Sequence, residues 1–196
     1  MGNTTTKQAS EAAQQFAIEG TLQEIVHVKT GHINETFRSK WLHKQTGAAR
    51  TFIHQCMNGE VFPNVPAVLE NVRLITEHLK PRLLARKQGE ETLQTVPTRS
   101  GEHFWRSPAG SFWRTFFYVD DSEGFDVSPS LAHARAVGEA FGRFLSLLSD
   151  FNTALLVKPI PEFQNVEMSL SQFEQALSAD PLGRAKDARE LIEFVL

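Results

Sequence analysis

The 196 residues have an ordinary globular composition, 41% hydrophobic and 22% charged, which excludes a chain disordered along its whole length. The length suffices for one sizeable domain, or for one small lobe with part of another. A net charge of −3 excludes a broadly basic surface, so we expect no nucleic-acid partner.

The single cysteine, Cys56, excludes an internal disulfide and indicates a reducing compartment. The first seven residues are polar and lack the apolar segment of a signal peptide. No apolar run approaches the roughly 20 residues that span a bilayer. We therefore expect a cytoplasmic protein without a membrane partner.

The first predicted element is a mildly amphipathic helix over Gln8–Glu19, ended by Gly20. Its apolar side consists of Ala9, Ala12, Ala13 and Phe16. A strand over Leu22–Val28 follows, and Gly31 permits a close turn.

Two further strands are predicted over Ile33–Leu42 and Arg50–Met57, with a polar hairpin turn over residues 44–48 between them. Three short antiparallel strands need a helix on one face to be stable. Asn64 is a plausible N-cap for such a helix, whose apolar residues recur every three or four positions as far as Leu79. Pro66 fits the first turn, and Pro81 is expected to stop or kink the helix.

Residues 87–101 indicate a loop and a weak strand. Two aromatic strands follow, over Phe104–Ser107 and Phe112–Val119, joined by a hairpin turn at residues 108–111. The expected fold class is therefore α+β, with about five mostly antiparallel strands and a packed helix.

A polar connector at residues 120–124 indicates a boundary between a sheet lobe, residues 1–121, and a helical part, residues 122–196. Ser128 is expected to cap the next helix, with Pro129 at its first position. Gly138 and Gly142 lie on one side of that helix, as in close helix packing.

Residues 152–166 are expected to be irregular and to precede a short helix over Ser171–Leu177. A last helix is predicted from Asp180–Pro181, with an apolar face that runs to Leu196 without a C-terminal signal. We expect a continuation of the chain or a partner chain to cover this face.

The Gly31 turn lies between two strands, where backbone N–H groups can contact phosphate oxygens, although an ordinary hairpin turn has the same local pattern. If Ile53 and Gln55 share a face of their strand, Ile53 would cover a base and Gln55 would point at phosphates. Kinase-like enzymes usually carry a charged lysine there. Glu70 is either the partner carboxylate of Gln55 or an exposed helix charge.

Phosphoryl transfer needs a catalytic aspartate, an asparagine about five residues later and a second metal-binding aspartate. None of the seven histidines starts a His-x-Asp motif, and no aspartate is followed by asparagine five positions on. We therefore predict no catalytic residue and no metal ligand within this sequence.

Several motifs together resemble the start of the N-acetylhexosamine 1-kinase group, in the aminoglycoside phosphotransferase superfamily with the kinase-like fold. They are, in chain order, Gly31–Phe37, Phe52–Asn58, Val61–Asn71, Trp113–Phe116, Gly138–Gly142 and Ile160–Phe163. The resemblance covers the chain from about residue 20 to its end.

The resemblance implies a kinase-like small lobe, ATP and Mg²⁺ as cofactors, and phosphorylation of a sugar hydroxyl. The nucleotide-binding residues that it implies, together with Ile53, are Gly31, His32, Asn34, Thr36, Gln55, Glu70, and Phe117, Tyr118 and Val119 as the hinge. In the family the catalytic loop follows the helix at which this sequence ends. We therefore expect the N-terminal portion of such a kinase, inactive alone, with Mg²⁺ and sugar binding dependent on the missing lobe.

Two other interpretations stay open. The chain could be a non-catalytic binding or interaction module that keeps the lobe as a scaffold. It could also be an unrelated α+β domain whose motifs match by chance.

Overall fold

The structure is a computed structural model that describes residues 4–29, 31–86, 93–125 and 127–195. The strands found in these ranges are β1 (Thr21–Val28), β2 (Glu35–Leu42), β3 (Ala49–Cys56), β4 (Thr95–Val96), β5 (Trp105–Arg106) and β6 (Phe112–Phe117). The α-helices are α1 (Thr6–Ala13), α2 (Val65–Arg86), α3 (Leu131–Leu147), α4 (Val166–Ala179) and α5 (Arg189–Val195), and the 3₁₀ turns are η1 (Thr153–Leu155) and η2 (Ala185–Ala188).

The chain divides into two compact units, of which the first ends at Pro159 and the second begins at Ile160. The first unit contains the sheet with α1, α2 and α3, and the second contains α4 and α5. The boundary that the sequence predicts after residue 121, between a sheet lobe and a helical part, is a different one and stays a prediction.

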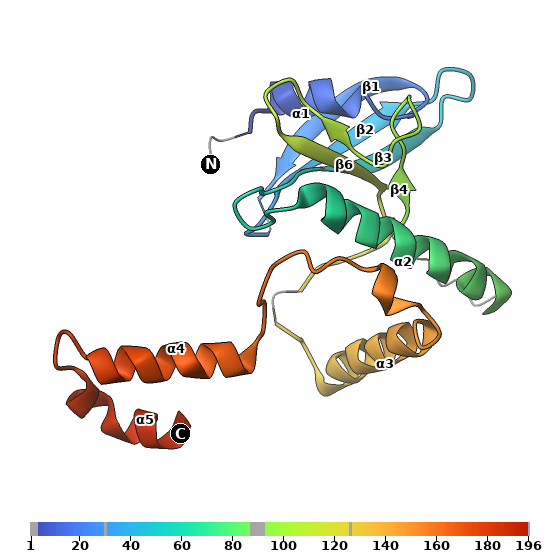
Figure 1. Cartoon of the computed structure of the whole chain (residues 1–196). Helices are drawn as coiled ribbons and strands as arrows, with labels where there is room; N and C mark the ends of the chain where they lie inside the picture. The colour runs from blue at the N-terminus through green and yellow to red at the C-terminus, as the bar shows by residue number, and fades with distance from the viewer. Residues whose placement is uncertain (1–3, 30, 87–92, 126, 196) are drawn as a thin grey trace. The chain divides into compact units, whose positions relative to one another are not determined.

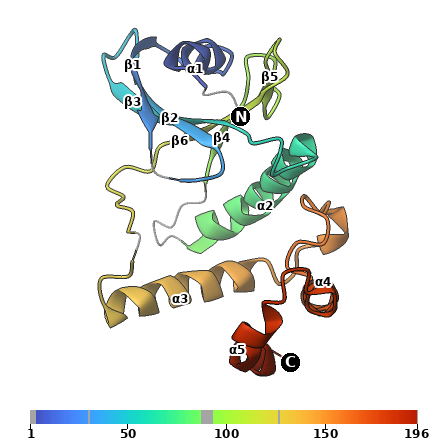
Figure 2. The same ribbon diagram turned by 90° about the vertical axis from the view of Figure 1, so that its left-hand side faces the viewer.

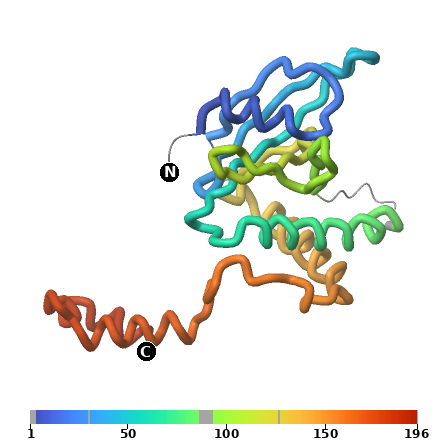
Figure 3. The backbone as a smooth tube through the Cα atoms, turned by 45° about the horizontal axis from the view of Figure 1, so that its top comes forward, coloured from blue at the N-terminus to red at the C-terminus, as the bar shows by residue number. Residues whose placement is uncertain are grey.

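All the described strands belong to one antiparallel sheet with the order β1-β2-β3-β6-β4, and β5 pairs with β6 beside this path. The α+β class is confirmed, and within the described residues the sheet has six strands. Figure 3 follows the backbone from α1 through β1, β2 and β3 into α2. The helix α2 thus lies in the chain between β3 and β4.

The main core lies between α1 and one face of the sheet, and Figures 1 and 2 show α1 covering that face. Alternate strand residues point into it because successive side chains in a strand face opposite sides. Their burial is nearly complete for Phe37, Trp41, Phe52 and Trp113, which pack on the alanines of α1.

The helix α1 is shorter than predicted, since it ends at Ala13 and not at Glu19. The backbone beyond it bonds to a distant segment, with Ala17 N donating to Pro97 O at 2.8 Å and Arg99 N donating to Gln15 O at 2.8 Å. Phe16 is fully buried and forms a bridge with Thr98. These tertiary hydrogen bonds replace the next helical turn.

The helix α2 begins after Asn64, whose Oδ1 accepts a hydrogen bond from Ala67 N at 3.2 Å, as an N-cap does. Val65 and Leu69 pack with Met57 in a second apolar cluster, bordered by Phe112. Of the two effects expected of Pro81, a stop or a kink, the stop does not occur, because α2 continues to Arg86.

A proline within a helix removes the hydrogen bond of its own nitrogen and crowds the preceding turn. In α2 the side chain of Arg82 donates from Nη1 to the carbonyl oxygen of His78 at 2.8 Å. The carbonyl that loses its helical donor at Pro81 is that of Glu77, so this bond serves the next carbonyl along, and α2 continues through the proline.

The capping residue of α3 is Ser130 and not Ser128, since Ser130 is extended and accepts a hydrogen bond from His133 N at 3.1 Å. Ser128 instead donates from Oγ to the Ser130 carbonyl at 3.0 Å. Among the helices of the described ranges, none has the length and apolarity to cross a membrane.

In the second unit, the helix expected over Ser171–Leu177 is the longer α4, capped by the Asn165 side chain. The last helix does not begin at Asp180 as predicted. The Asp180 carboxylate accepts from Arg184 N at 2.8 Å and holds a turn there, and α5 begins only at Arg189.

Candidate functional site

The sheet face opposite α1 carries a row of polar side chains, here called the polar row, that consists of Thr36, Gln55 and Arg114. The register places Thr36 opposite Gln55, and Gln55 opposite Arg114. Thr36 also pairs with Val28, the last residue of β1 before the Gly31 turn. The polar row therefore crosses three strands beside this turn.

Hydrogen bonds join the three side chains of the polar row. Arg114 donates to Gln55 Oε1 from both Nε, at 3.0 Å, and Nη2, at 2.8 Å. Gln55 Nε2 donates to Thr36 Oγ1 at 3.2 Å. Each partner sits on a different strand, so the sheet register fixes the arrangement.

Arg114 is a half-buried cation whose hydrogen-bonding partner is a neutral amide. Burial lowers the pKa of Arg114 to about 10, which leaves the guanidinium charged at neutral pH. The guanidinium also lies over the Phe116 ring, 4.9 Å from its centroid. A desolvated positive charge that has no carboxylate partner among the described residues favours binding of an anion.

The face becomes apolar one step further along the strands. Ile53 lies on the same face of β3 as Gln55, as its alternation predicts, and pairs with Phe116 on β6. Phe116 is 4% exposed, so the apolar area that this face offers to a base comes mainly from the half-buried Ile53.

The predicted hinge, Phe117 to Val119, begins at the last residue of β6. Phe117 is partly exposed and packs its ring on Phe52, with centroids 5.4 Å apart. Tyr118 N donates to Thr51 O at 3.2 Å, which continues the ladder past the end of β6. Val119 is 49% exposed, and its carbonyl accepts a hydrogen bond from Ser122 Oγ.

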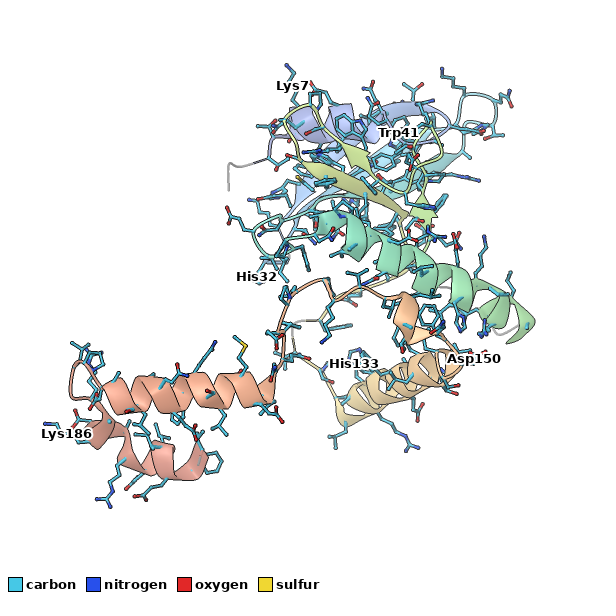
Figure 4. All side chains as sticks on the ribbon, viewed as in Figure 1. Lys7, His32, Trp41, His133, Asp150 and Lys186 are labelled. Carbon is cyan, nitrogen blue, oxygen red and sulfur yellow. The ribbon has the colours of Figure 1, made fainter. Side chains whose placement is uncertain are left out.

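The turn residues have separate roles. Gly31 has a φ of +103°, in the region that favours glycine, and is exposed. His32 lies exposed at this turn, and Figure 4 shows it far from Trp41, which lies near the other end of β2. Asn34 Oδ1 accepts from Asn58 N at 3.0 Å, which ties the turn to the end of β3.

Glu70 is not brought to Gln55. Its carboxylate instead accepts two hydrogen bonds from Arg73, one turn later in α2, with Nε to Oε2 at 2.8 Å. The Arg73 guanidinium lowers the pKa of Glu70. Of the two readings that the sequence left open, this geometry is that of an exposed helix charge.

Arg114 is the residue that sequence reasoning missed. The signal was an arginine within an aromatic strand, placed two residues before Phe116 and therefore on the same face. The sequence does not say which strand pairs with the strand of Arg114. The position of Arg114 opposite Gln55 follows only from the β3–β6 register.

A second polar cluster has the geometry of a nucleophile and its base. Ser39 Oγ lies 2.7 Å from His54 Nε2, and His54 Nδ1 lies 2.8 Å from Thr115 Oγ1. Ser39 is 1% exposed and His54 0%, so no substrate reaches them. Trp41 Nε1 donates to Ser39 Oγ at 2.9 Å, and the cluster serves to satisfy polar groups inside the core.

In the part of the chain that the structure describes, no three His, Cys, Asp or Glu side chains gather as metal ligands would. We therefore name no residue as a Mg²⁺ ligand.

No family model matches the sequence.

Proposed function

We propose that the sheet and α2 form the nucleotide-binding small lobe of a protein of the aminoglycoside phosphotransferase and N-acetylhexosamine kinase type. The observation that carries the proposal is the polar row beside the Gly31 turn, next to the apolar surface of Ile53 and Phe116. A charged end for phosphates and an apolar end for a base are what a nucleotide requires.

The strand order supports this proposal. The sheet runs β1-β2-β3-β6-β4, a helix lies in the chain between β3 and β4, and the hinge residues follow β6. A glycine turn between the first two strands and a helix after the third are the arrangement that the family resemblance implies.

The proposal assigns nucleotide binding to these 196 residues and no phosphoryl transfer. The sequence contains neither a His-x-Asp motif nor an aspartate followed by asparagine five positions later. Sugar phosphorylation with Mg²⁺ is proposed only for the family, with a second lobe present. A cytoplasmic location remains part of the proposal.

Isothermal titration of the full chain with ATP, with and without Mg²⁺, tests the proposal. We expect binding that is insensitive to Mg²⁺ and weaker in Gln55→Ala, which removes the acceptor of both Arg114 hydrogen bonds. Lys44→Ala, in the hairpin turn between β2 and β3, is the matched control. Absence of ATP binding in the folded wild type would contradict the proposal.

A non-catalytic interaction module is the second candidate function. It is favoured by the exposed apolar side chains of α3, including Leu131 at 91% and Phe141 at 65%. Light scattering over a range of concentrations tests it, because an interaction surface of this kind predicts self-association that Phe141→Glu abolishes. A wild type that remains monomeric at high concentration would count against this candidate.

A further inference from the structure

We infer that Arg114 on β6 is the phosphate-binding cation of this lobe, and that Gln55 on β3 is the residue that positions it. Kinase-like enzymes usually place a lysine on the third strand for this task. In this chain the third strand carries a neutral amide, and the charge is supplied from the neighbouring strand. The inference rests on the proposed function and names the residue that binds the anionic part of the ligand.

The donor count shows that Arg114 has capacity for a ligand. A guanidinium has five N–H groups in a fixed plane. Gln55 Oε1 takes one from Nε and one from Nη2, which leaves three, two of them on Nη1.

The Nη1 atom, which carries two of these N–H groups, is not fully buried. Among the described residues, the fully buried side-chain polar atom without a hydrogen-bond partner is His103 Nδ1, and no Arg114 atom is in that state. Three donors on one charged plane match the oxygens of a phosphate better than those of a neutral ligand.

The position of Arg114 favours the phosphates of a nucleotide over free phosphate. The polar row lies beside the Gly31 turn, whose backbone can approach a ligand closely. Phe116, under the guanidinium, continues into the apolar surface with Ile53. A ligand with both an anionic and a flat apolar part would contact both regions.

Gln55 fixes the direction of the guanidinium. Two hydrogen bonds to one oxygen define its plane, and Thr36 holds the amide of Gln55 from the other side. Gln55 therefore acts through Arg114, and its removal should weaken binding less than removal of the charge.

The test is a set of calorimetric titrations of the full chain with ATP, adenosine and tripolyphosphate. We expect wild type to bind tripolyphosphate in competition with ATP. Arg114→Met should weaken ATP and tripolyphosphate binding about tenfold or more, the loss of a charge-assisted hydrogen bond, and leave adenosine binding unchanged. Arg114→Lys should restore much of the binding.

Arg106→Met is the matched control, since Arg106 on β5 also lies over a phenylalanine, 5.3 Å from the Phe112 centroid, but is itself exposed. It should bind ATP as wild type does. A folded Arg114→Met with unchanged affinity for ATP and tripolyphosphate would overturn the inference.

The wild-type titrations decide the matter if Arg114→Met does not fold. ATP bound no more tightly than adenosine would overturn the inference and leave nucleotide binding intact. If the wild type binds tripolyphosphate but neither ATP nor adenosine, the proposed function is contradicted and the anion site is retained. If it binds none of the three, the proposed function and the inference about Arg114 are both overturned.

Discussion

Asn71 in α2 binds both backbone groups of Val157, a residue 86 positions later in the chain. Its Nδ2 donates to Val157 O at 2.7 Å, and its Oδ1 accepts from Val157 N at 3.1 Å. One side chain thus replaces a pair of ladder bonds and fixes the segment after α3 to the helix beside the sheet.

Replacement of Asn71 by alanine should release this segment. The loss of two hydrogen bonds at a partly exposed site should cost about 1–2 kcal/mol of unfolding free energy. Hydrogen exchange followed by NMR should show faster exchange at the Val157 amide, with Lys80→Ala on the exposed side of α2 as control. Unchanged protection of Val157 would show that the contact does not hold the segment.

The buried His54 makes stability depend on pH. Burial lowers its pKa from 6.5 to about 4, so the folded state binds the proton only at lower pH than the unfolded chain does. The free energy of unfolding is therefore unaffected by His54 above pH 6.5. It falls as the pH drops from 6.5 toward 4, and below pH 4 His54 causes no further loss. The loss should be about 3 kcal/mol.

Denaturant titrations between pH 7 and pH 4 measure this effect. His54→Gln removes the titrating group and should flatten the pH profile relative to wild type, whereas His32→Gln at the exposed turn should not. An NMR titration of the wild-type His54 ring with a midpoint near 6.5, its ordinary value, would contradict the prediction.

Two glycines with positive φ should respond differently to the same substitution. Gly20 has a φ of +126°, and a Cβ there would lie 2.4 Å from Leu42 O, which belongs to the backbone and cannot move aside easily. Gly31 has a φ of +103°, and apart from its chain neighbours no atom of the described residues lies within 4 Å of the added carbon.

Gly31→Ala should therefore cost only the backbone strain, about 1–2 kcal/mol, and Gly20→Ala several kcal/mol more. Urea unfolding of the two variants tests the ranking. Equal destabilisation would mean that the Leu42 carbonyl shifts without cost.

Pro81 lies inside α2, where a proline disfavours the helix by up to about 3 kcal/mol relative to alanine. Pro81→Ala should therefore raise the unfolding free energy by about 1–3 kcal/mol. Pro66→Ala is the matched control, since a proline in the first helical turn loses no helical hydrogen bond and its replacement should change little. Thermal unfolding followed by circular dichroism distinguishes the two, and equal shifts in Tm would contradict the explanation.

Local patterns in the sequence determined the elements of the sheet. Alternation of apolar residues located β1, β2 and β3 within two residues at each end, and the turn at residues 108–111 located the hairpin of β5 and β6. The same alternation placed Ile53 and Gln55 on one face of β3. These features depend on neighbours in the chain, so a sequence contains them directly.

The tertiary structure alone decided which groups meet. α1 ends early because residues 97–99 form hydrogen bonds with the backbone groups that follow it. Gln55 pairs with Arg114 because β6 lies between β3 and β4 in the sheet. Glu70, at the expected helix position, binds Arg73 instead of Gln55. Such pairings depend on register and on distances between segments far apart in the chain, which periodicity cannot specify.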